Sequence, residues 1–339
     1  METSFLQAHP HRRWNPFLNK WVLISPHRTS RPWNGAKEIA LPKVASFDPK
    51  CYLCPDVTRY SGIQNPQYTE TYVFDNDYMA LIPDVEPCTY TQGLFQARCE
   101  RGLSRVIVYH PDHSLTMADM SREQIEKVIQ TWRNEYQVLG EKDFINYVTI
   151  FENKGQMMGC SNPHPHGQIW ASESIPQYPG KEAESMFDYH LKNNACMMCQ
   201  YRLDELANQE RVIFQNDSFT VILPFWAVWP FETWVISNDH IGSLADFTAK
   251  TTRDLADILK QILTRYDALF QVSFPYSMGI HQSPTDGLPH PEQHFHMHFF
   301  PPLLRDAQTR KFSVGYELTS EEQRDFSPEY AAARLKEIH

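Results

Sequence analysis

The sequence contains one pattern of motifs twice. A Cys-x-x-Cys pair occurs at 51–54 and again at 196–199, and each pair is followed by a β-rich run that contains Asn-Asp. An Asp-His pair comes later in each copy, at 112–113 and at 239–240, and an amphipathic segment follows it. Because a duplication would produce all of these agreements together, we interpret the chain as two copies of one structural unit.

The amphipathic segment of each copy predicts a helix that faces a core. In the first copy, Ser121 and Gln124 have the spacing of a capping box. Hydrophobic residues recur there every three to four positions, at Ile125, Val128, Ile129, Trp132, Tyr136 and Leu139. The second copy has the same stripe at Leu255, Ile258, Leu259, Ile262, Leu263, Tyr266 and Leu269. Such stripes are typical of packed helices rather than of cofactor-binding segments.

Short β-rich runs surround both predicted helices, with turn residues between them. The runs are TYVF, RVIVY, YVTIF, VIFQ, TWVIS and HFHMHFF. We therefore expect an α+β fold, in which antiparallel sheet is backed by helices. A chain of 339 residues has the length of two domains. Pro, Gly and charged residues mix at 173–195, so we expect a boundary near 180–195, between domains at 1–180 and 181–339.

Composition argues against several classes of protein. A net charge of −10 and a pI near 5.8 argue against broad nucleic-acid binding. No run reaches the roughly 20 apolar residues of a membrane span, and the N-terminal residues lack the apolar stretch of a signal peptide. We therefore expect a cytoplasmic protein. In that compartment, the seven cysteines are expected to be thiols or metal ligands rather than disulfides.

The first Cys-x-x-Cys pair predicts a zinc site. Cys51 and Cys54 could hold one cation from a tight turn, and structural zinc sites are completed by two further Cys or His ligands. His113 is one candidate, and either His164 or His166 could supply the fourth ligand. The alternative is a redox pair, or two thiols that are merely buried.

The second pair predicts a similar site with an open ligand set. The cysteines at 196–199 and His240 could be completed by His294 or by His296.

A different cluster competes with that second site. His281, His296 and His298 could converge with a carboxylate to form a metal site rich in nitrogen and oxygen. His296 cannot easily serve both clusters, so the sequence leaves the choice between them open.

The stretch SNPHPHGQIW suggests covalent catalysis. If His164 binds zinc, His166 is free to act as a nucleophile, because a neutral imidazole attacks phosphorus well at physiological pH. Gln168 would share its face of an extended strand, and Gly159 and Ser161 could donate hydrogen bonds to the same phosphate oxygens. The alternatives are two metal ligands or two structural histidines. The prolines of this stretch are expected to stiffen a strand at a sheet edge.

Two arginines are placed to bind a diphosphate. Arg28 and Arg31 flank a turn and could clamp phosphate oxygens bidentately, although arginines in a loop can equally be solvated. They lie in a Pro-rich stretch at 26–49 that we expect to be an ordered loop, since it contains Trp33 and Phe47.

Long segments of the chain resemble one enzyme family. HPHRRWNPFLNKWVLISPHRTSRPW, FENKGQMMGCSNPHPHGQIW, FPYSMGIHQSP and HFFPPLLRDAQTRKFSVGYEL are similar to segments of the galactose-1-phosphate uridylyltransferases, of the histidine triad superfamily. The resemblance covers nearly the whole chain. It implies two histidine-triad repeats joined in a half-barrel sheet, a homodimer, and ping-pong transfer of UMP from UDP-glucose to galactose 1-phosphate through a uridylyl-histidine at His166.

The resemblance also implies roles for individual residues. The catalytic set would be His166, Gln168 and Ser161, and the structural zinc ligands would be Cys51, Cys54, His113 and His164. Phosphate, ribose and uridylyl contacts would come from Arg28, Arg31, Asn76, Asp77, Asn153, Gly159, Cys160, Ser161 and Gln168. The sugar would be read in the partner subunit's site by Lys311, Phe312, Val314, Tyr316, Glu317 and Gln323. A second metal, iron or zinc, would be bound by Glu182, His281, His296 and His298.

The pair at 196–199 departs from the family pattern and matches a second zinc site of related nucleotidyltransferases, so Cys196, Cys199 and His240 form the rival second site. Alternative functions are transfer or phosphorolysis of another nucleotide sugar such as ADP-glucose, hydrolysis of the nucleotidyl-histidine, or a zinc-stabilised binding module without turnover. The segment 311–323 favours transfer over hydrolysis, because it could hold an acceptor sugar phosphate in place of water.

Overall fold

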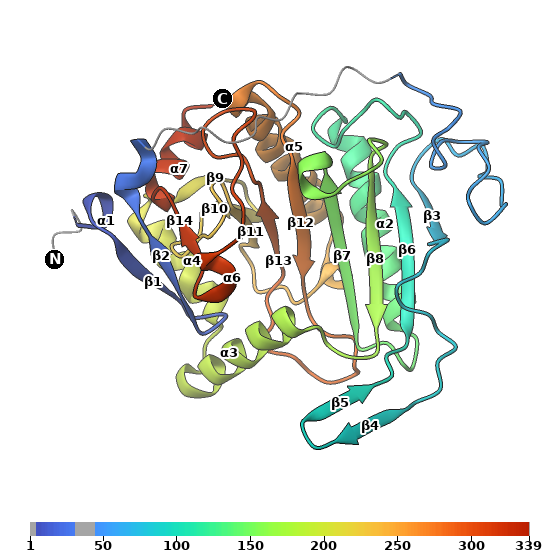
Figure 1. Ribbon diagram of the computed structural model, residues 1–339, viewed down its shortest axis with the longest axis horizontal. Coiled ribbons are helices and arrows are strands. Elements are labelled where there is room, and N and C mark those ends of the chain that lie inside the picture. Colours follow the sequence, from blue (N-terminus) through green and yellow to red (C-terminus); the bar gives the residue numbers. More distant parts are fainter. Residues whose placement is uncertain (1–4, 31–44, 339) are drawn as a thin grey trace.

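A nine-stranded sheet forms the centre of the computed structural model, which describes residues 5–30 and 45–338 (Figure 1). In sheet order the strands are β3 (Tyr72–Asp75), β6 (Gly102–Val108), β8 (His166–Ser172), β7 (Tyr147–Lys154), β12 (Tyr276–His281), β13 (His296–Phe300), β11 (Thr233–Ser237), β10 (Phe219–Ile222) and β9 (Val212–Gln215). Every pairing in this sheet is antiparallel. The predicted α+β class with antiparallel sheet is confirmed.

The order of elements repeats along the chain. The first half runs β6, α2 (Arg122–Gly140), β7 and β8, and the second runs β11, α5 (Ala249–Phe270), β12 and β13. In the sheet the two sets lie in opposite order, and they meet where β7 pairs with β12, for example Phe151 with Gly279. The two copies of the sequence pattern therefore build one continuous sheet.

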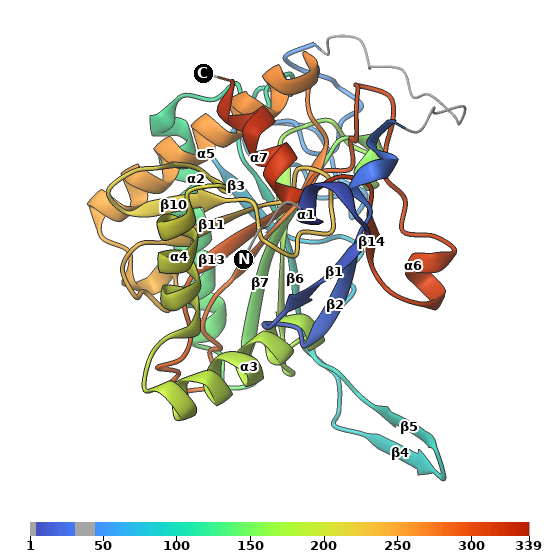
Figure 2. The same ribbon diagram turned by 90° about the vertical axis from the view of Figure 1, so that its left-hand side faces the viewer.

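Both predicted helices form where the hydrophobic stripes lie. At the start of α2, Ser121 Oγ accepts a hydrogen bond from the Gln124 N–H, and Gln124 Oε1 accepts one from the Ser121 N–H, so the capping box is confirmed. Thr248 caps α5 by accepting from the Thr251 N–H. The helices contact each other and cover one face of the sheet (Figure 2). Their stripes are buried in one apolar cluster with the strands.

The opposite face carries smaller elements. A three-stranded sheet joins β1 (His11–Asn15), β2 (Lys20–Ile24) and β14 (Gln323–Arg324), the last in parallel with β2. The other helices of the described residues are α1 (Phe5–Ala8), α3 (Gln177–Asn193), α4 (Met197–Asn208), α6 (Tyr316–Thr319) and α7 (Pro328–Lys336), with 3-10 turns at Pro26–Ser30, Gln156–Met158 and Leu244–Asp246. Of these, α7 contacts α5 and the turn at Leu244–Asp246 contacts α2, so both lie with the two long helices. A hairpin of β4 (Thr89–Gln92) and β5 (Phe95–Arg98) projects from the body (Figures 1 and 2).

One pair of cysteines differs from the expectation. Cys88 and Cys99 flank the projecting hairpin and form a disulfide, so the prediction that the cysteines are thiols or metal ligands is wrong for this pair. The sequence pattern pointed to the Cys-x-x-Cys pairs, whereas the disulfide depends on the hairpin, which brings together two cysteines 11 residues apart.

The predicted edge strand is also wrong. β8 lies between β6 and β7 and begins at His166, and the prolines Pro163 and Pro165 stand in the loop before it. Their missing N–H groups therefore remove no hydrogen bond from the ladder.

The predicted boundary region and the predicted ordered loop can be placed. The stretch at 173–195, where the domain boundary is expected, is largely the helix α3. Of the predicted ordered loop at 26–49, residues 26–30 form a 3-10 turn, and 31–44, with Arg31 and Trp33, lie outside the described residues. Among the helices of the described residues, none has the length and apolar character needed to cross a bilayer.

Candidate functional site

Four side chains from distant segments converge beside the start of β8. Sγ of Cys54 lies 3.7 Å from Nδ1 of His113 and 3.5 Å from Nδ1 of His164, and Sγ of Cys51 lies 3.8 Å from Nδ1 of His164. The two Nδ1 atoms are 3.2 Å apart. Ligand atoms around a tetrahedral zinc ion lie about 3.3–3.8 Å apart, given the usual Zn–N and Zn–S bond lengths. The arrangement therefore fits a zinc ion, and it selects His164 rather than His166.

Hydrogen bonds and burial around this cluster favour the orientation and protonation state that a metal ligand needs. Nε2 of His164 lies 2.8 Å from the carbonyl oxygen of His110, which makes Nδ1 the nitrogen with the free lone pair. The amide of Asn162 donates to Sγ of Cys51 at 3.3 Å. Burial lowers the pKa of His164 to about 3, so its imidazole is neutral, as a metal ligand must be. Burial raises the pKa of Cys54 to about 11, so in the absence of a cation this thiol stays protonated.

His166 opens β8 and is oriented by its own backbone. Its Nδ1 lies 2.7 Å from the carbonyl oxygen of His164, so Nδ1–H is the donor and Nε2 carries the free lone pair. Burial lowers the pKa of His166, and the hydrogen bond to His164 offsets part of this effect. The neutral imidazole is therefore the favoured form at neutral pH, with the nitrogen that can attack already defined.

The predicted phosphate contacts lie around this histidine. β7 pairs with β8, with Phe151 opposite Gln168, and continuation of that register puts Asn153 opposite His166. Oδ1 of Asn153 accepts a hydrogen bond from the Ser277 hydroxyl at 2.6 Å. Oε1 of Gln168 accepts one from Nε1 of Trp170 at 3.1 Å.

The loop before the histidines holds the other predicted donors. Gly159 has a φ of 80° and closes a 3-10 turn, and its N–H donates to the carbonyl of Gln156 at 2.9 Å. Cys160 donates its thiol to the carbonyl of Asn162 at 3.1 Å, and burial raises its pKa. Ser161 is exposed. In this arrangement the hydroxyl of Ser161, rather than the N–H of Gly159, is the donor left facing solvent.

The second Cys-x-x-Cys pair forms an equivalent cluster. Nδ1 of His294 lies 3.4 Å from both Cys196 Sγ and Cys199 Sγ, and Nδ1 of His240 lies 3.7 Å from Cys199 Sγ. Nε2 of His294 lies 2.8 Å from the carbonyl oxygen of Ser237, so Nδ1 is again the free nitrogen. These spacings also fit a tetrahedral zinc ion. The fourth member is His294, one of the two histidines that the sequence left open.

The third cluster is separate from the second. Nδ1 of His281 lies 2.5 Å from Oε2 of Glu182, and Nε2 of His296 and of His298 lie 3.6 and 3.9 Å from the same carboxylate. Glu182 comes from α3, and its side chain is buried. Burial alone would raise the pKa of Glu182, but the histidines lower it well below its usual range. The Cys196 cluster and the Glu182 cluster can therefore both exist, because His294 belongs to the first and His296 to the second.

Two buried nitrogens in this third cluster are available to coordinate a cation. Nε2 of His296 and Nε2 of His298 are buried and have no hydrogen-bond partner among the described residues. Burial lowers the pKa of both imidazoles, which keeps them neutral and able to coordinate. Three imidazole nitrogens and one carboxylate fit iron or zinc.

The predicted sugar-recognition residues line one cavity of about 480 Å³. It is bounded by Arg28 and by all six members of the predicted set, which are Lys311, Phe312, Val314, Tyr316, Glu317 and Gln323. Lys311 donates to the carbonyl of Gln323, and its Nζ lies 3.4 Å from Oε1 of Glu317. The lining contains none of His166, Gln168 and Ser161. The structure thus gathers the recognition residues in one cavity, whose described lining does not include His166.

The predicted nucleotide contacts are only partly gathered. Nε of Arg28 lies 3.3 Å from Oδ1 of Asp325 at the recognition cavity, and Arg31 lies outside the described residues. Asn76 and Asp77 follow β3, two strands from β8 in the sheet. The carboxylate of Asp77 accepts a hydrogen bond from Arg59 at 3.1 Å.

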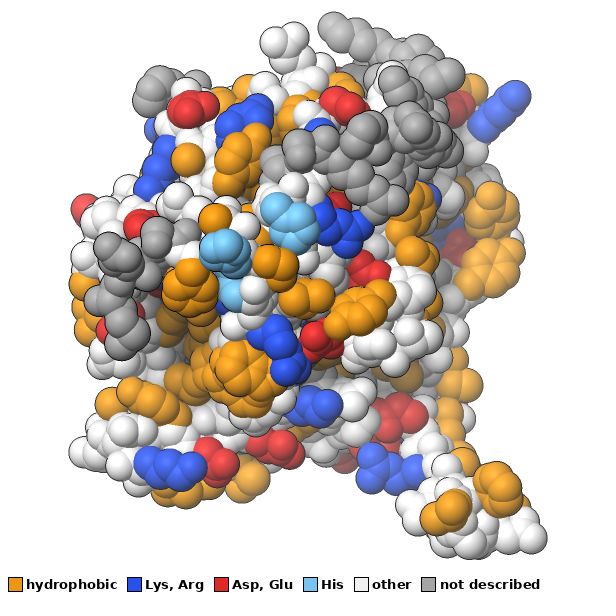
Figure 3. Space-filling model, turned by 60° about the vertical axis from the view of Figure 1, so that its left-hand side comes forward, with side chains coloured by type: hydrophobic (Ala, Val, Ile, Leu, Met, Phe, Trp, Pro, Cys, Tyr) orange, Lys and Arg blue, Asp and Glu red, His pale blue; other side chains and the backbone are white. Residues whose placement is uncertain are grey.

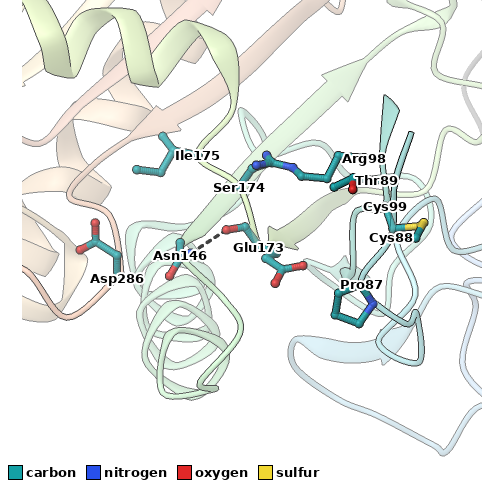
Figure 4. Close-up of a pocket in the computed structure, with 10 residues that line it drawn as sticks. All are labelled: Pro87, Cys88, Thr89, Arg98, Cys99, Asn146, Glu173, Ser174, Ile175 and Asp286. Carbon is teal, nitrogen blue, oxygen red and sulfur yellow. Dashed lines mark hydrogen bonds between the residues drawn. A yellow bond between two sulfur atoms is a disulfide. The ribbon is translucent and has the colours of Figure 1, made fainter. Parts of the chain in front are cut away.

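A second cavity of about 550 Å³ lies at the base of the projecting hairpin (Figure 4). Its wall includes the disulfide between Cys88 and Cys99, and the amide of Asn146 donates to the carbonyl of Glu173 beside it. It contains none of the sequence-predicted site residues.

Several residues of the sites were not singled out from the sequence. Arg310, Arg324 and Asp325 line the recognition cavity, and Asn162 binds Cys51. The position of Glu152 did carry a signal, because it occupies an inward position of β7, where an apolar residue is expected.

The chain matches one family over nearly its whole length. Residues 1–176 match the N-terminal domain, and residues 182–339 the C-terminal domain, of galactose-1-phosphate uridyl transferase. The galactose-1-phosphate uridylyltransferase of Haemophilus influenzae is 46% identical over 336 residues, which is 98% of this chain and 96% of the relative. The enzyme of the same name from Saccharomyces cerevisiae is 44% identical over 347 residues, which is 98% of this chain and 95% of the relative.

Solved structures have the same fold. A uridylyltransferase structure superposes with a TM-score of 0.76 at 26% identity, covering 96% of this chain and 97% of the other. An ADP-glucose phosphorylase from Arabidopsis thaliana, solved with bound ADP-glucose, has a TM-score of 0.77 at 24% identity, covering 97% of this chain and 99% of the other. The chain therefore belongs to the galactose-1-phosphate uridylyltransferase family.

Proposed function

We propose that the protein transfers UMP from UDP-glucose to galactose 1-phosphate, with His166 as the covalent carrier. The observation that carries the proposal is the bond between Nδ1 of His166 and the His164 carbonyl, which leaves Nε2 as the nucleophile. Membership of the family, with relatives named for this activity, supports the choice of substrates.

In the first step, the Nε2 lone pair of His166 attacks the α-phosphorus of UDP-glucose. A nitrogen–phosphorus bond forms, the bond to the bridging oxygen breaks, and glucose 1-phosphate leaves with that electron pair. In the second step, a phosphate oxygen of galactose 1-phosphate attacks the same phosphorus, and the nitrogen–phosphorus bond returns its electrons to His166. The histidine is regenerated, and UDP-galactose leaves.

The residues beside His166 would hold the transferring group. The amide of Gln168 and the hydroxyl of Ser161 are donors for its phosphate oxygens, and Asn153 stands opposite on β7. We assign Gly159 and Cys160 to the same loop contacts, and Asn76 and Asp77 to the uridine ribose. Arg28 and Arg31 are assigned to the diphosphate.

We propose that the first cluster binds structural zinc through Cys51, Cys54, His113 and His164. When bound there, the ion links the turn at 51–54 to the residue that orients His166. We propose a second zinc ion at Cys196, Cys199, His240 and His294, and iron or zinc at Glu182, His281, His296 and His298. All three could be bound together, because no ligand is shared between the clusters.

The recognition cavity is proposed to serve a partner subunit. It lacks His166, so a homodimer in which each chain lends this cavity to the other would complete two sites. Exposed aromatic residues support such contact: the side chains of Trp14 and Trp21 on β1 and β2 are exposed, with ring centroids 5.2 Å apart. The side of the molecule that carries β1 and β2 faces the viewer in Figure 3. Hydrophobic and cationic side chains are interspersed there.

We further propose domains at 1–180 and 181–339, each built around one copy of the repeated unit, in a cytoplasmic enzyme. The succession of strands and helix in each half supports this division.

The test is to incubate the protein with UDP-glucose labelled at the α-phosphate and to follow acid-labile label on the chain. The wild-type protein should take up label and release it as UDP-galactose when galactose 1-phosphate is added. The His166→Gly variant should take up none, whereas Cys199→Ser, in the cluster of the other half, serves as a matched control that keeps the nucleophile. Label that persists in His166→Gly would contradict the mechanism. Label obtained from ADP-glucose but not from UDP-glucose would instead favour a phosphorylase or transferase of adenine nucleotides.

A further inference from the structure

Gly167 stands between His166 and Gln168 but faces the opposite side of β8. The flanking side chains are partly exposed, whereas Gly167 is buried toward the helices. Its φ is not positive, so the backbone conformation does not require glycine. The surrounding atoms do require glycine, because a Cβ at this position would overlap the hydroxyl of Tyr109 and lie 2.9 Å from the carbonyl oxygen of Phe151.

Tyr109 lies beneath this strand and is held on several sides. Its N–H donates to the carbonyl of Pro165 at 2.9 Å, one residue before His166. The side chain is 2% exposed, and its ring packs edge-on against Trp132 of α2, with centroids 6.0 Å apart. The hydroxyl makes no hydrogen bond of ordinary geometry among the described residues, and neither does the buried Nε1 of Trp132. Burial raises the pKa of the hydroxyl well above its usual range, and a hydrogen-bonding interaction with the Trp132 side chain opposes this effect.

Neighbouring polar side chains complete the layer between the sheet and the helices. The Tyr276 hydroxyl donates to Oε2 of Glu152 at 3.2 Å, and both side chains are buried. On the same strand as Glu152, Lys154 pairs with Asp267 of α5 at 3.1 Å. Close-packed interiors do not yield to small changes in volume. A hydroxyl held in such a layer therefore sets the position of the backbone that contacts it.

We propose that Tyr109 is a positioning residue for catalysis. Its hydroxyl, in contact with Gly167, fixes how far β8 lies from the helix layer, and it thereby fixes the placement of His166 and Gln168 against the phosphorus of the substrate. The inference rests on the proposed uridylyl transfer and deepens it. A nucleophile must lie about 3–3.5 Å from the atom it attacks, and a displacement of about 1 Å costs on the order of 100-fold in rate. The contact between Gly167 and Tyr109 lies one residue from that nucleophile.

The test is a double-mutant cycle with a matched control in the same sheet. Gly167→Ala forces the overlap, and Tyr109→Phe removes the hydroxyl while keeping the ring. Gly102 of β6 provides the control, because a Cβ there would overlap the carbonyl oxygen of Ala171, which Tyr109→Phe cannot relieve. Three quantities are measured: the single-turnover rate of label uptake at saturating α-labelled UDP-glucose, the Kd for UDP-glucose, and the thermal midpoint.

Gly167→Ala should slow label uptake about 100-fold while changing the Kd for UDP-glucose less than about threefold, because the effect lies in placement of the nucleophile. Adding Tyr109→Phe should raise that rate at least about tenfold. Recovery should stay incomplete, because the new Cβ would still lie 2.9 Å from the Phe151 carbonyl oxygen and 3.0 Å from Cζ of the ring at 109. In the Gly102→Ala background, Tyr109→Phe should restore nothing. Gly167→Ala with the wild-type rate, or a double variant as slow as Gly167→Ala, would overturn the inference.

The thermal midpoints separate this inference from the proposed function. If wild-type protein takes up no label, the proposed function fails. In that case Tyr109→Phe should still raise the midpoint of Gly167→Ala, but not that of Gly102→Ala, which tests the steric contact alone. If wild-type protein takes up label and the midpoint recovers without the rate, the contact is structural and the positioning role is refuted.

Discussion

Nδ1 of His166 lies 2.7 Å from the carbonyl oxygen of His164, the residue whose own Nδ1 points into the Cys-His cluster. The second half of the chain has the same bond, since Nδ1 of His296 lies 2.8 Å from the carbonyl oxygen of His294. In both halves this bond leaves Nε2 free. In the second half that nitrogen faces the carboxylate of Glu182, so one local arrangement supports a candidate nucleophile in one half and a metal cluster in the other.

The two Cys-His clusters should differ in their effect on catalysis. Cys54→Ser should lose one equivalent of zinc and slow label uptake at least tenfold, because His164 both belongs to this cluster and orients His166. Cys199→Ser should also lose one equivalent of zinc, but label uptake should stay within about twofold, because the members of its cluster come from the other half of the chain and include no residue of β8. Elemental analysis and single-turnover labelling measure the two quantities. Equal slowing in both variants would contradict the assignment.

The cluster around Glu182 should contribute to stability. Glu182→Ala leaves the buried imidazoles of His281, His296 and His298 without the carboxylate, so one metal equivalent should be lost. Loss of a buried charged partner should lower the free energy of unfolding by about 1–3 kcal/mol. Urea unfolding and metal analysis check both results. Since His166 is not part of this cluster, a variant that loses metal and stability should still take up label; a variant that keeps its full metal content would refute the assignment.

Mixed dimers test whether the recognition cavity serves the partner. His166→Gly and Glu317→Ala should each be inactive alone. In a mixed dimer, one site would combine the intact histidine of one chain with the intact cavity of the other. Random mixing should therefore restore about a quarter of wild-type activity. If each cavity serves the histidine of its own chain, neither site of a mixed dimer is intact, and mixing restores nothing.

The buried carboxyl of Glu152 should make stability depend on pH. Burial raises the pKa of Glu152 to about 7, although Lys154 and Tyr276 act in the opposite direction. The protonated form is favoured in the folded state, so its stabilising contribution is complete below the unfolded pKa and is lost as pH rises through about 7. The loss should approach about 3 kcal/mol by pH 8.

Comparison with Glu152→Gln isolates this contribution. Urea unfolding at pH 5.5 and at pH 8 should show a smaller decline in the variant, because glutamine does not titrate. Equal declines in both proteins would show that other groups cause the pH dependence.

Much of the fold follows from local sequence. Ser121 and Gln124 cap α2 because their side chains bond backbone groups only three residues away, and the hydrophobic stripes define which faces of α2 and α5 are buried. The repeated motifs predicted two equivalent sets of elements, and the sheet contains them. In each of these cases, the interacting groups lie within a few turns or strands of one another.

Other features could not be read locally. The sequence left His294 and His296 as alternatives for one site. Only the tertiary structure showed that His296 of β13 lies beside Glu182 of α3, whereas His294 lies beside the two cysteines. The interior position of β8 was likewise set by its pairing with β6, a distant segment. The disulfide between Cys88 and Cys99 joins two cysteines only 11 residues apart across a hairpin, but no motif in the sequence pointed to it.

The sequence by itself determined the repeated elements, the helix caps and the types of ligand that each metal cluster offers, because these depend on residue identity and short spacing. The tertiary structure alone decided which ligands share a cluster, that the recognition residues line one cavity whose described lining does not include His166, and that Gly167 contacts Tyr109. Those outcomes depend on contacts between residues far apart in the chain, and the spacing of a motif does not specify such contacts.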